Sequence, residues 1–143
     1  MAKKRISKAI KEQVRNRANG ICEYCLSQEK FASQSFSIDH VLPEIEGGKG
    51  ILENLSLACQ GCNNFKYTKT NAKDFNSGKM VRLFNPRNDK WLDHFKWNEN
   101  FTVIIAVSPI GRVTIDALNL NRESLLNQRS LYRAFGIHPP DII

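Results

Sequence analysis

The pattern of hydrophobic and polar positions predicts a helix near the start of the chain. Ile10 and Val14 are four residues apart and therefore share one face of a helix over residues 8–18. Ser7 has a side chain suited to capping the first turn, and Gly20 is suited to ending the helix. An amphipathic first helix is the simplest interpretation of this segment.

Two strands and a second helix follow. Residues 35–41 and 54–59 alternate apolar and polar positions, the period of a half-buried strand. A glycine-rich loop at 43–50 separates them, and the segment from about Gly61 predicts a short helix. Further along, we predict a strand over residues 102–107, a turn at "SPIG" and a helix near 122–135.

Composition and charge narrow the function classes. A chain of 143 residues suits one domain, and no apolar run is long enough to cross a membrane. The start is basic but lacks the apolar stretch of a secretory signal, so we expect a cytoplasmic protein. Residues 1–19 carry seven Lys or Arg and one Glu, which suits a polyanionic partner, although charge alone fits a merely solvated helix equally well.

The cysteines predict a structural zinc site. They form two Cys-x2-Cys pairs, and each pair can direct two thiolates at one ion, whereas a redox function would not explain two pairs. With every position of the tetrahedron occupied by sulfur, this zinc would be closed to substrate, and catalysis would need a second site. The four predicted ligands are Cys22, Cys25, Cys59 and Cys62.

The stretch "CEYC…FSIDHVLPEIEGG…NLSLACQGCNNFK" resembles the HNH endonucleases over residues 18–70. The remainder resembles an accessory region in one bacterial, particularly cyanobacterial, branch of that family. The resemblance implies an α+β fold with a zinc-stapled, treble-clef-like ββα-metal nuclease core, an N-terminal helix and a small C-terminal α/β extension. We expect the basic helix at 1–20, the core at 21–75 and an accessory region packed on it at 76–143.

The resemblance also implies a metal-dependent DNA endonuclease that hydrolyses phosphodiester bonds. His40 is the expected general base, since an imidazole is partly neutral near pH 7. Asn54 is expected to fix the loop that orients it. Asp39 and Asn63 would hold Mg²⁺ or Mn²⁺ as oxygen ligands. In a regular strand Asp39 and His40 project to opposite sides, and the resemblance implies that the break at Pro43 brings both to one cleft.

One feature keeps an alternative open. Many members of the family have a histidine where this chain has Asn63, so a zinc-stabilised nucleic-acid-binding module without hydrolysis is the second hypothesis. Lys66 is equally well explained as a solvated lysine or as a ligand of a phosphate oxygen. A homodimer is a further expectation, because one active site usually needs a second copy to cleave both DNA strands. Arg82 and Arg87 are further candidates for the DNA backbone. The residues expected to contact DNA first are Lys66, Lys3, Lys4, Arg5 and Arg15.

Overall fold

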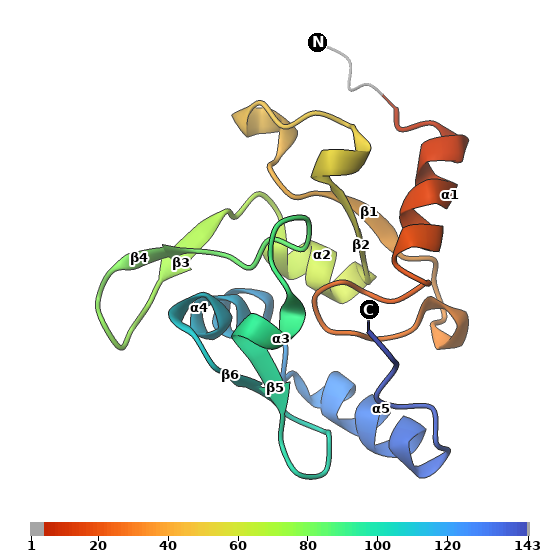
Figure 1. Ribbon diagram of the computed structural model, residues 1–143, viewed down its shortest axis with the longest axis vertical. Coiled ribbons are helices and arrows are strands. Elements are labelled where there is room, and N and C mark those ends of the chain that lie inside the picture. The colour runs from red at the N-terminus through yellow and green to blue at the C-terminus, as the bar shows by residue number, and fades with distance from the viewer. Residues whose placement is uncertain (1–4, 143) are drawn as a thin grey trace. The chain divides into compact units, whose positions relative to one another are not determined.

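The computed structural model describes residues 5–142, which form two compact units (Figure 1). Unit 1 comprises the chain up to Thr70 together with Asn85–Asn88, and unit 2 comprises Asn71–Phe84 and the chain from Asp89 onward. Both units combine helices with two-stranded antiparallel sheets, so the predicted α+β class is confirmed. The packing of residues 76–143 on the core stays a prediction.

Within residues 5–70 and 85–88, unit 1 contains two helices, one antiparallel strand pair and three single turns of 3₁₀ helix. Its core consists of apolar side chains from the first helix, the first cysteine pair and the second strand, such as Val14, Tyr24 and Leu57. Its elements are α1 (Lys8–Arg17), η1 (Glu29–Phe31), β1 (Ser37–His40), η2 (Glu44–Glu46), η3 (Leu52–Asn54), β2 (Leu55–Ala58) and α2 (Gln60–Lys66).

Helix α1 forms for the predicted reasons. The Ser7 hydroxyl accepts a hydrogen bond from the Ile10 amide at 3.2 Å, which satisfies one of the free donors of the first turn. Val14 is fully buried on the inner face of the helix. The chain then turns through Asn19 and Gly20, both with positive φ, so the predicted stop is confirmed within one or two residues.

Strands β1 and β2 pair antiparallel, with Ser37 opposite Ala58 and His40 opposite Leu55. Both are shorter than predicted, because the chain leaves the sheet toward Pro43 after His40 and enters it from η3 before Leu55. Cys59 caps α2, since its sulfur accepts from the Cys62 amide at 3.4 Å. The predicted order of strand, loop, strand and helix is therefore confirmed.

Unit 2 contains two strand pairs and three helices around a core of aromatic and aliphatic side chains. Trp91 and Phe84 both pack against Phe95, with ring centroids 5.1 and 5.3 Å away. Its elements are β3 (Asn71–Lys73), β4 (Met80–Arg82), α3 (Trp91–His94), β5 (Phe95–Trp97), β6 (Ile104–Ala106), α4 (Pro109–Leu118) and α5 (Glu123–Ala134).

The prediction of a turn at "SPIG" is wrong. Ser108 is the N-cap of α4, and its hydroxyl accepts from the Gly111 amide at 3.0 Å. Pro109 occupies the first helical position, where its missing N–H has no intrahelical acceptor to lose. A serine followed by proline was therefore a helix start. Among residues 5–142, no helix is both long enough and apolar enough to cross a bilayer.

Candidate active site and metal centre

The two cysteine pairs come together in unit 1 as a buried cluster. One sulfur from each of the four residues lies within 4.8 Å of the other three, and the Sγ atoms of Cys25 and Cys59 are 3.6 Å apart. A tetrahedral zinc centre with Zn–S bonds of about 2.3 Å places its sulfurs about 3.8 Å apart. The donor set and its spacing therefore fit zinc, as the sequence indicated.

Each Cys-x2-Cys pair forms a tight turn, called a knuckle here, whose backbone amide points at the sulfur of its first cysteine. The amides of Cys25 and Cys62 point at the sulfurs three residues earlier, at 3.5 and 3.4 Å. Burial raises the pKa of the Cys22 thiol well above its usual range, whereas hydrogen bonds from Cys22 and the other two thiols lower the pKa of Cys59. Four buried thiolates at this spacing repel one another, so a divalent cation is needed for all four to be charged.

Asp39 and His40 lie on opposite faces of β1. The strand pairs regularly up to His40, so neighbouring side chains alternate. Asp39 is 4% exposed and points to the interior, while His40 is only half-buried. The two residues therefore do not converge on one cleft in this structure, and the break at Pro43 comes too late in the chain to turn Asp39 outward.

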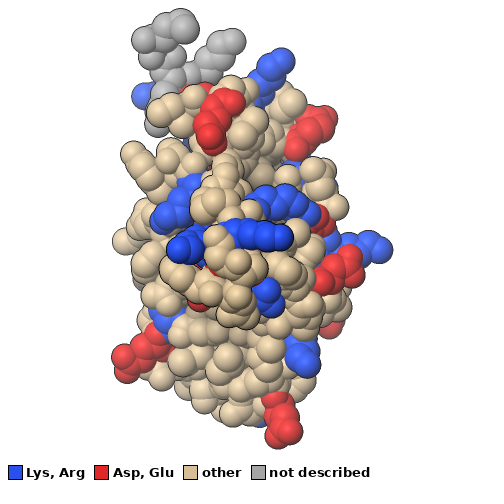
Figure 2. Space-filling model, turned by 90° about the vertical axis from the view of Figure 1, so that its left-hand side faces the viewer, with Lys and Arg blue, Asp and Glu red and all other residues tan. Residues whose placement is uncertain are grey.

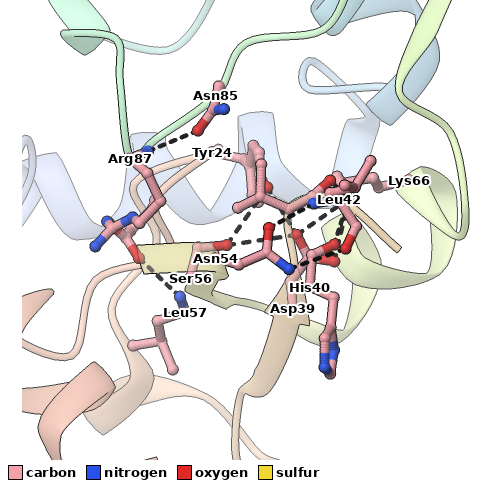
Figure 3. Close-up of polar contacts among 12 residues, drawn as sticks. Tyr24, Asp39, His40, Leu42, Asn54, Ser56, Leu57, Lys66, Asn85 and Arg87 are labelled. Atoms are coloured by element: carbon pink, nitrogen blue, oxygen red, sulfur yellow. Dashed lines mark hydrogen bonds and ion pairs between the residues drawn. The ribbon is translucent and has the colours of Figure 1, made fainter. Parts of the chain in front are cut away.

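Asp39 is the centre of a buried polar network (Figure 3). The Tyr24 hydroxyl donates to its Oδ2 at 2.8 Å, and the Lys66 ammonium lies 3.2 Å from the same oxygen. Ser56 contributes a longer contact at 3.4 Å. Burial raises the pKa of the Asp39 carboxyl above its ordinary value, and Lys66, Tyr24 and Ser56 oppose this without cancelling it.

Lys66 is not a surface residue, contrary to both interpretations of it. It is 1% exposed, and besides Asp39 its ammonium donates to the carbonyls of His40 and Val41 at 3.1 and 3.2 Å. All three donors of the ammonium are thus used inside unit 1. Lys66 ties α2 to the end of β1 and is not available to a DNA phosphate in this arrangement.

His40 faces the carboxylate of Glu44. Its Nε2 lies 3.3 Å from an oxygen of Glu44, which belongs to the 3₁₀ turn η2. Pro43 starts this turn and folds the chain back, so a residue four positions later returns to the imidazole. The Glu44 carboxylate therefore fixes the orientation of the His40 ring.

Asn54 holds the loop between the strands closed (Figure 3). Its amide oxygen accepts from the Leu42 amide at 2.9 Å, and its NH₂ donates to the carbonyls of Leu42 and Lys49, both at 3.0 Å. The loop comes so close that a Cβ on Gly48 would lie 1.7 Å from the Leu42 carbonyl oxygen. These contacts fix the backbone two residues after His40.

Asn63 lies in the first half of α2, three residues before Lys66 and hence on a similar face. Because Lys66 reaches Asp39 from this helix, the side of α2 that carries Asn63 is turned toward β1. Among residues 5–142, the only group of three or more Cys, His, Asp or Glu at metal-binding distance is the cysteine cluster. Asn63 therefore stays a predicted ligand.

The predicted DNA contacts of the N-terminal region have different outcomes. Lys3 and Lys4 lie outside the described residues, and Arg5 is exposed. Arg15 is not free for a phosphate, since its guanidinium pairs with Glu29 and donates to the Phe36 carbonyl, each at 3.3 Å.

Two further arginines near the core have structural contacts. Arg17 donates to the Leu52 carbonyl at 2.8 Å and also to that of Leu55. Arg87 pairs with Glu23, which lies between the first two cysteines, and Glu23 also accepts from the Leu57 amide. Burial raises the pKa of Glu23 although Leu57 and Arg87 lower it. Arg87 therefore links its segment to the first cysteine pair, and its contact with the DNA backbone stays a prediction.

The comparisons with known proteins agree with this geometry. The family model described as HNH endonuclease matches residues 22–69, which run from the first cysteine of the cluster to just beyond α2 and cover about a third of the chain. No curated protein and no solved structure gives a significant match. Residues 22–69, called the HNH module from here on, are therefore similar to the HNH endonucleases, and this similarity indicates a nuclease-type function and a nucleic-acid substrate. The resemblance to a particular bacterial branch stays a prediction.

Proposed function

We propose that the protein is a metal-dependent DNA endonuclease that hydrolyses phosphodiester bonds. The proposal rests on one combination: within the HNH module, Asn54 makes three hydrogen bonds to the loop that follows His40. A binding module has little need to fix a partly exposed histidine in this way. A general base, in contrast, must be held at hydrogen-bond distance from the water it deprotonates.

In this proposal His40 takes the proton of the attacking water. Its imidazole is accessible at the surface of unit 1, with 18% of the side chain exposed. Glu44 stabilises the imidazolium that results, because its carboxylate lies 3.3 Å from Nε2. Asn54 acts through the backbone, since it touches Leu42 and Lys49 and not the imidazole itself.

Asp39 and Asn63 are the residues that would hold a catalytic ion. Their carboxylate and amide oxygens are hard donors that suit Mg²⁺ or Mn²⁺ better than Ni²⁺. When bound, such an ion neutralises charge on the phosphate in the transition state. The cation beside Asp39 in this structure is the Lys66 ammonium at 3.2 Å, and His40 lies on the opposite face of β1. The proposal therefore requires that Lys66 releases Asp39 or shares it with the metal, and that the end of β1 rearranges so that Asp39 and His40 reach the same phosphate.

Cleavage of supercoiled plasmid DNA by the zinc-loaded protein tests the proposal. We expect nicking with Mg²⁺ or Mn²⁺, little with Ni²⁺, and a decrease of roughly 10²- to 10⁴-fold in His40→Ala, the usual contribution of a general base. His94→Ala is the matched control, because that histidine contacts Ser108 in unit 2 and is not part of the site. Equal rates in wild type and His40→Ala would contradict the assignment.

The ion pair of Asp39 supports one alternative, a zinc-stabilised nucleic-acid-binding module without hydrolysis. A carboxylate already neutralised by Lys66 is a weaker metal ligand, and Asn63 stands where many family members have a histidine. In the same assay this module would bind the plasmid and leave it uncut with each ion. If linear plasmid is the first product, without a nicked intermediate, two copies of the protein act together as a homodimer.

A further inference from the structure

The hairpin formed by β3 and β4 in unit 2 has two chemically different faces. Lys73 of β3 is directly opposite Met80 of β4, and both are exposed. The Phe75 ring, 77% exposed, lies next to Lys73, whose ammonium is 5.7 Å from the ring centroid. Lys79 lies opposite Asp74 where the turn begins, so it belongs to the end of the hairpin and not to this face, and it is exposed there. This outer face is therefore basic and apolar.

The inner face packs on α4, which contacts both strands. It carries the one acidic residue of the hairpin, Asp74, which is 3% exposed. Both oxygens of Asp74 accept from the Arg112 guanidinium, at 3.1 and 3.3 Å, and the turn is closed by the Ser77 hydroxyl and the Asn76 amide. Hydrogen bonds from Arg112 lower the pKa of Asp74, so the carboxylate stays charged and turned away from the outer face.

Lys73 on the outer face and Lys79 at the end of the hairpin are not neutralised by ion pairs among residues 5–142. Neither Lys73 nor Lys79 forms an ion pair within the part of the chain that the structure describes. Arg82 differs, because it binds Asp89 with two hydrogen bonds of 2.7 and 3.0 Å. In Figure 2, which views the side where β3 and β4 lie in Figure 1, Lys and Arg side chains gather near the middle of the surface.

We propose that the outer face of the β3–β4 hairpin binds duplex DNA. The inference extends the proposed function, because it takes the nucleic-acid substrate from the HNH module and assigns part of its binding to unit 2. A two-stranded ribbon is about the size that the major groove of B-DNA admits. Lys73 and Lys79 contact phosphates, while Phe75 and Met80 face the apolar edges of the bases, such as the thymine methyl.

These two kinds of contact leave different signatures in a salt titration. Each phosphate contact adds about 0.9 to the slope of log K against log salt. Removal of both lysines should lower that slope by about 1.8 and weaken binding on the order of 60-fold at 0.1 M salt. Removal of the Phe75 ring should weaken binding by roughly 5- to 30-fold at every salt concentration and leave the slope unchanged.

Fluorescence anisotropy of a labelled duplex of about 20 base pairs measures both quantities on the zinc-loaded full chain, without added Mg²⁺ or Mn²⁺ so that the probe stays intact. The variants are the double substitution Lys73→Gln with Lys79→Gln, and Phe75→Ala. The matched control is Lys90→Gln with Lys96→Gln, which removes two exposed charges of unit 2 outside the hairpin. All these side chains are exposed, so thermal unfolding should be unchanged and should verify that each variant is folded.

The proposal holds if the hairpin variants lose affinity as described and the control loses less than about threefold. It is overturned if the hairpin and control variants weaken binding equally, or if neither weakens it. It is also overturned if the protein binds a labelled single strand of the same length more tightly than the duplex and the hairpin variants lose that preference. Failure of the proposed nuclease activity is a separate result. In that case the plasmid stays uncut with Mg²⁺ and Mn²⁺ while the hairpin-dependent binding persists.

Discussion

Replacement of Lys66 by methionine tests the central ion pair of unit 1. The change keeps most of the length of the side chain and removes the charge beside Asp39. At the observed separation of 3.2 Å and an effective dielectric constant of about 20, the attraction is about 5 kcal/mol. Both side chains are almost completely buried, so solvent screens this attraction little. We therefore expect the free energy of unfolding of unit 1 to fall by about 3–5 kcal/mol at pH 7, the usual cost of leaving a buried charge without its partner.

The loss of stability caused by Lys66→Met should depend on pH. Burial raises the pKa of Asp39, and removal of Lys66 takes away the largest opposing effect, so the folded variant binds a proton more readily than the unfolded chain. Between the ordinary pKa of an aspartate and this raised folded value, the stability of the variant therefore increases as pH falls and is lost as pH rises. Asp39→Asn in the Lys66→Met background should restore part of the stability at pH 7.

Hydrogen exchange of the β1–β2 amides is the suitable assay, because both tryptophans lie in unit 2 and would not report on unit 1. Lys69→Met is the matched control. This lysine is exposed just beyond the same helix, and its ammonium donates to the Phe65 carbonyl, so the substitution should change stability by less than about 0.5 kcal/mol. A Lys66→Met cost below about 1 kcal/mol, or no rescue by Asp39→Asn, would refute the reasoning.

Two further predictions concern the metal and the loop. Removal of the metal by a chelator, or Cys62→Ser, should abolish protection of the β1–β2 amides, since structural zinc contributes on the order of 10 kcal/mol; metal analysis should find one zinc per chain, and a metal-free chain with unchanged protection would contradict the assignment. Asn54→Ala removes three hydrogen bonds and should lower the free energy of local unfolding of the loop by about 2–3 kcal/mol. Hydrogen exchange at the Leu42 amide should then be faster and DNA cleavage slower. Asn64→Ala, an exposed position of α2, is its control, and equal cleavage by both variants would argue against the role of Asn54.

Local chemistry explains what the sequence predicted well. The cap at Ser7 involves a residue three positions away, and each cysteine pair is set by a turn of four residues. Alternation predicted β1 and β2 because one face of each strand must be buried. The metal ligands and the order of elements in unit 1 could therefore be read from neighbouring residues. The missed helix α4 was also local, and its Ser-Pro start was the signal that could have found it.

The tertiary structure alone decided which charges are available for function. Lys66 and Asp39 are 27 residues apart, and Arg15 lies 21 residues from the Phe36 carbonyl it binds, so no local pattern predicts either contact. The sequence by itself determined the residue types, the zinc ligands and the two strands before the second knuckle. Packing then turned some cations inward as structural ties and left Lys73 and Lys79 outside, because a charge is solvated unless the fold supplies a buried partner.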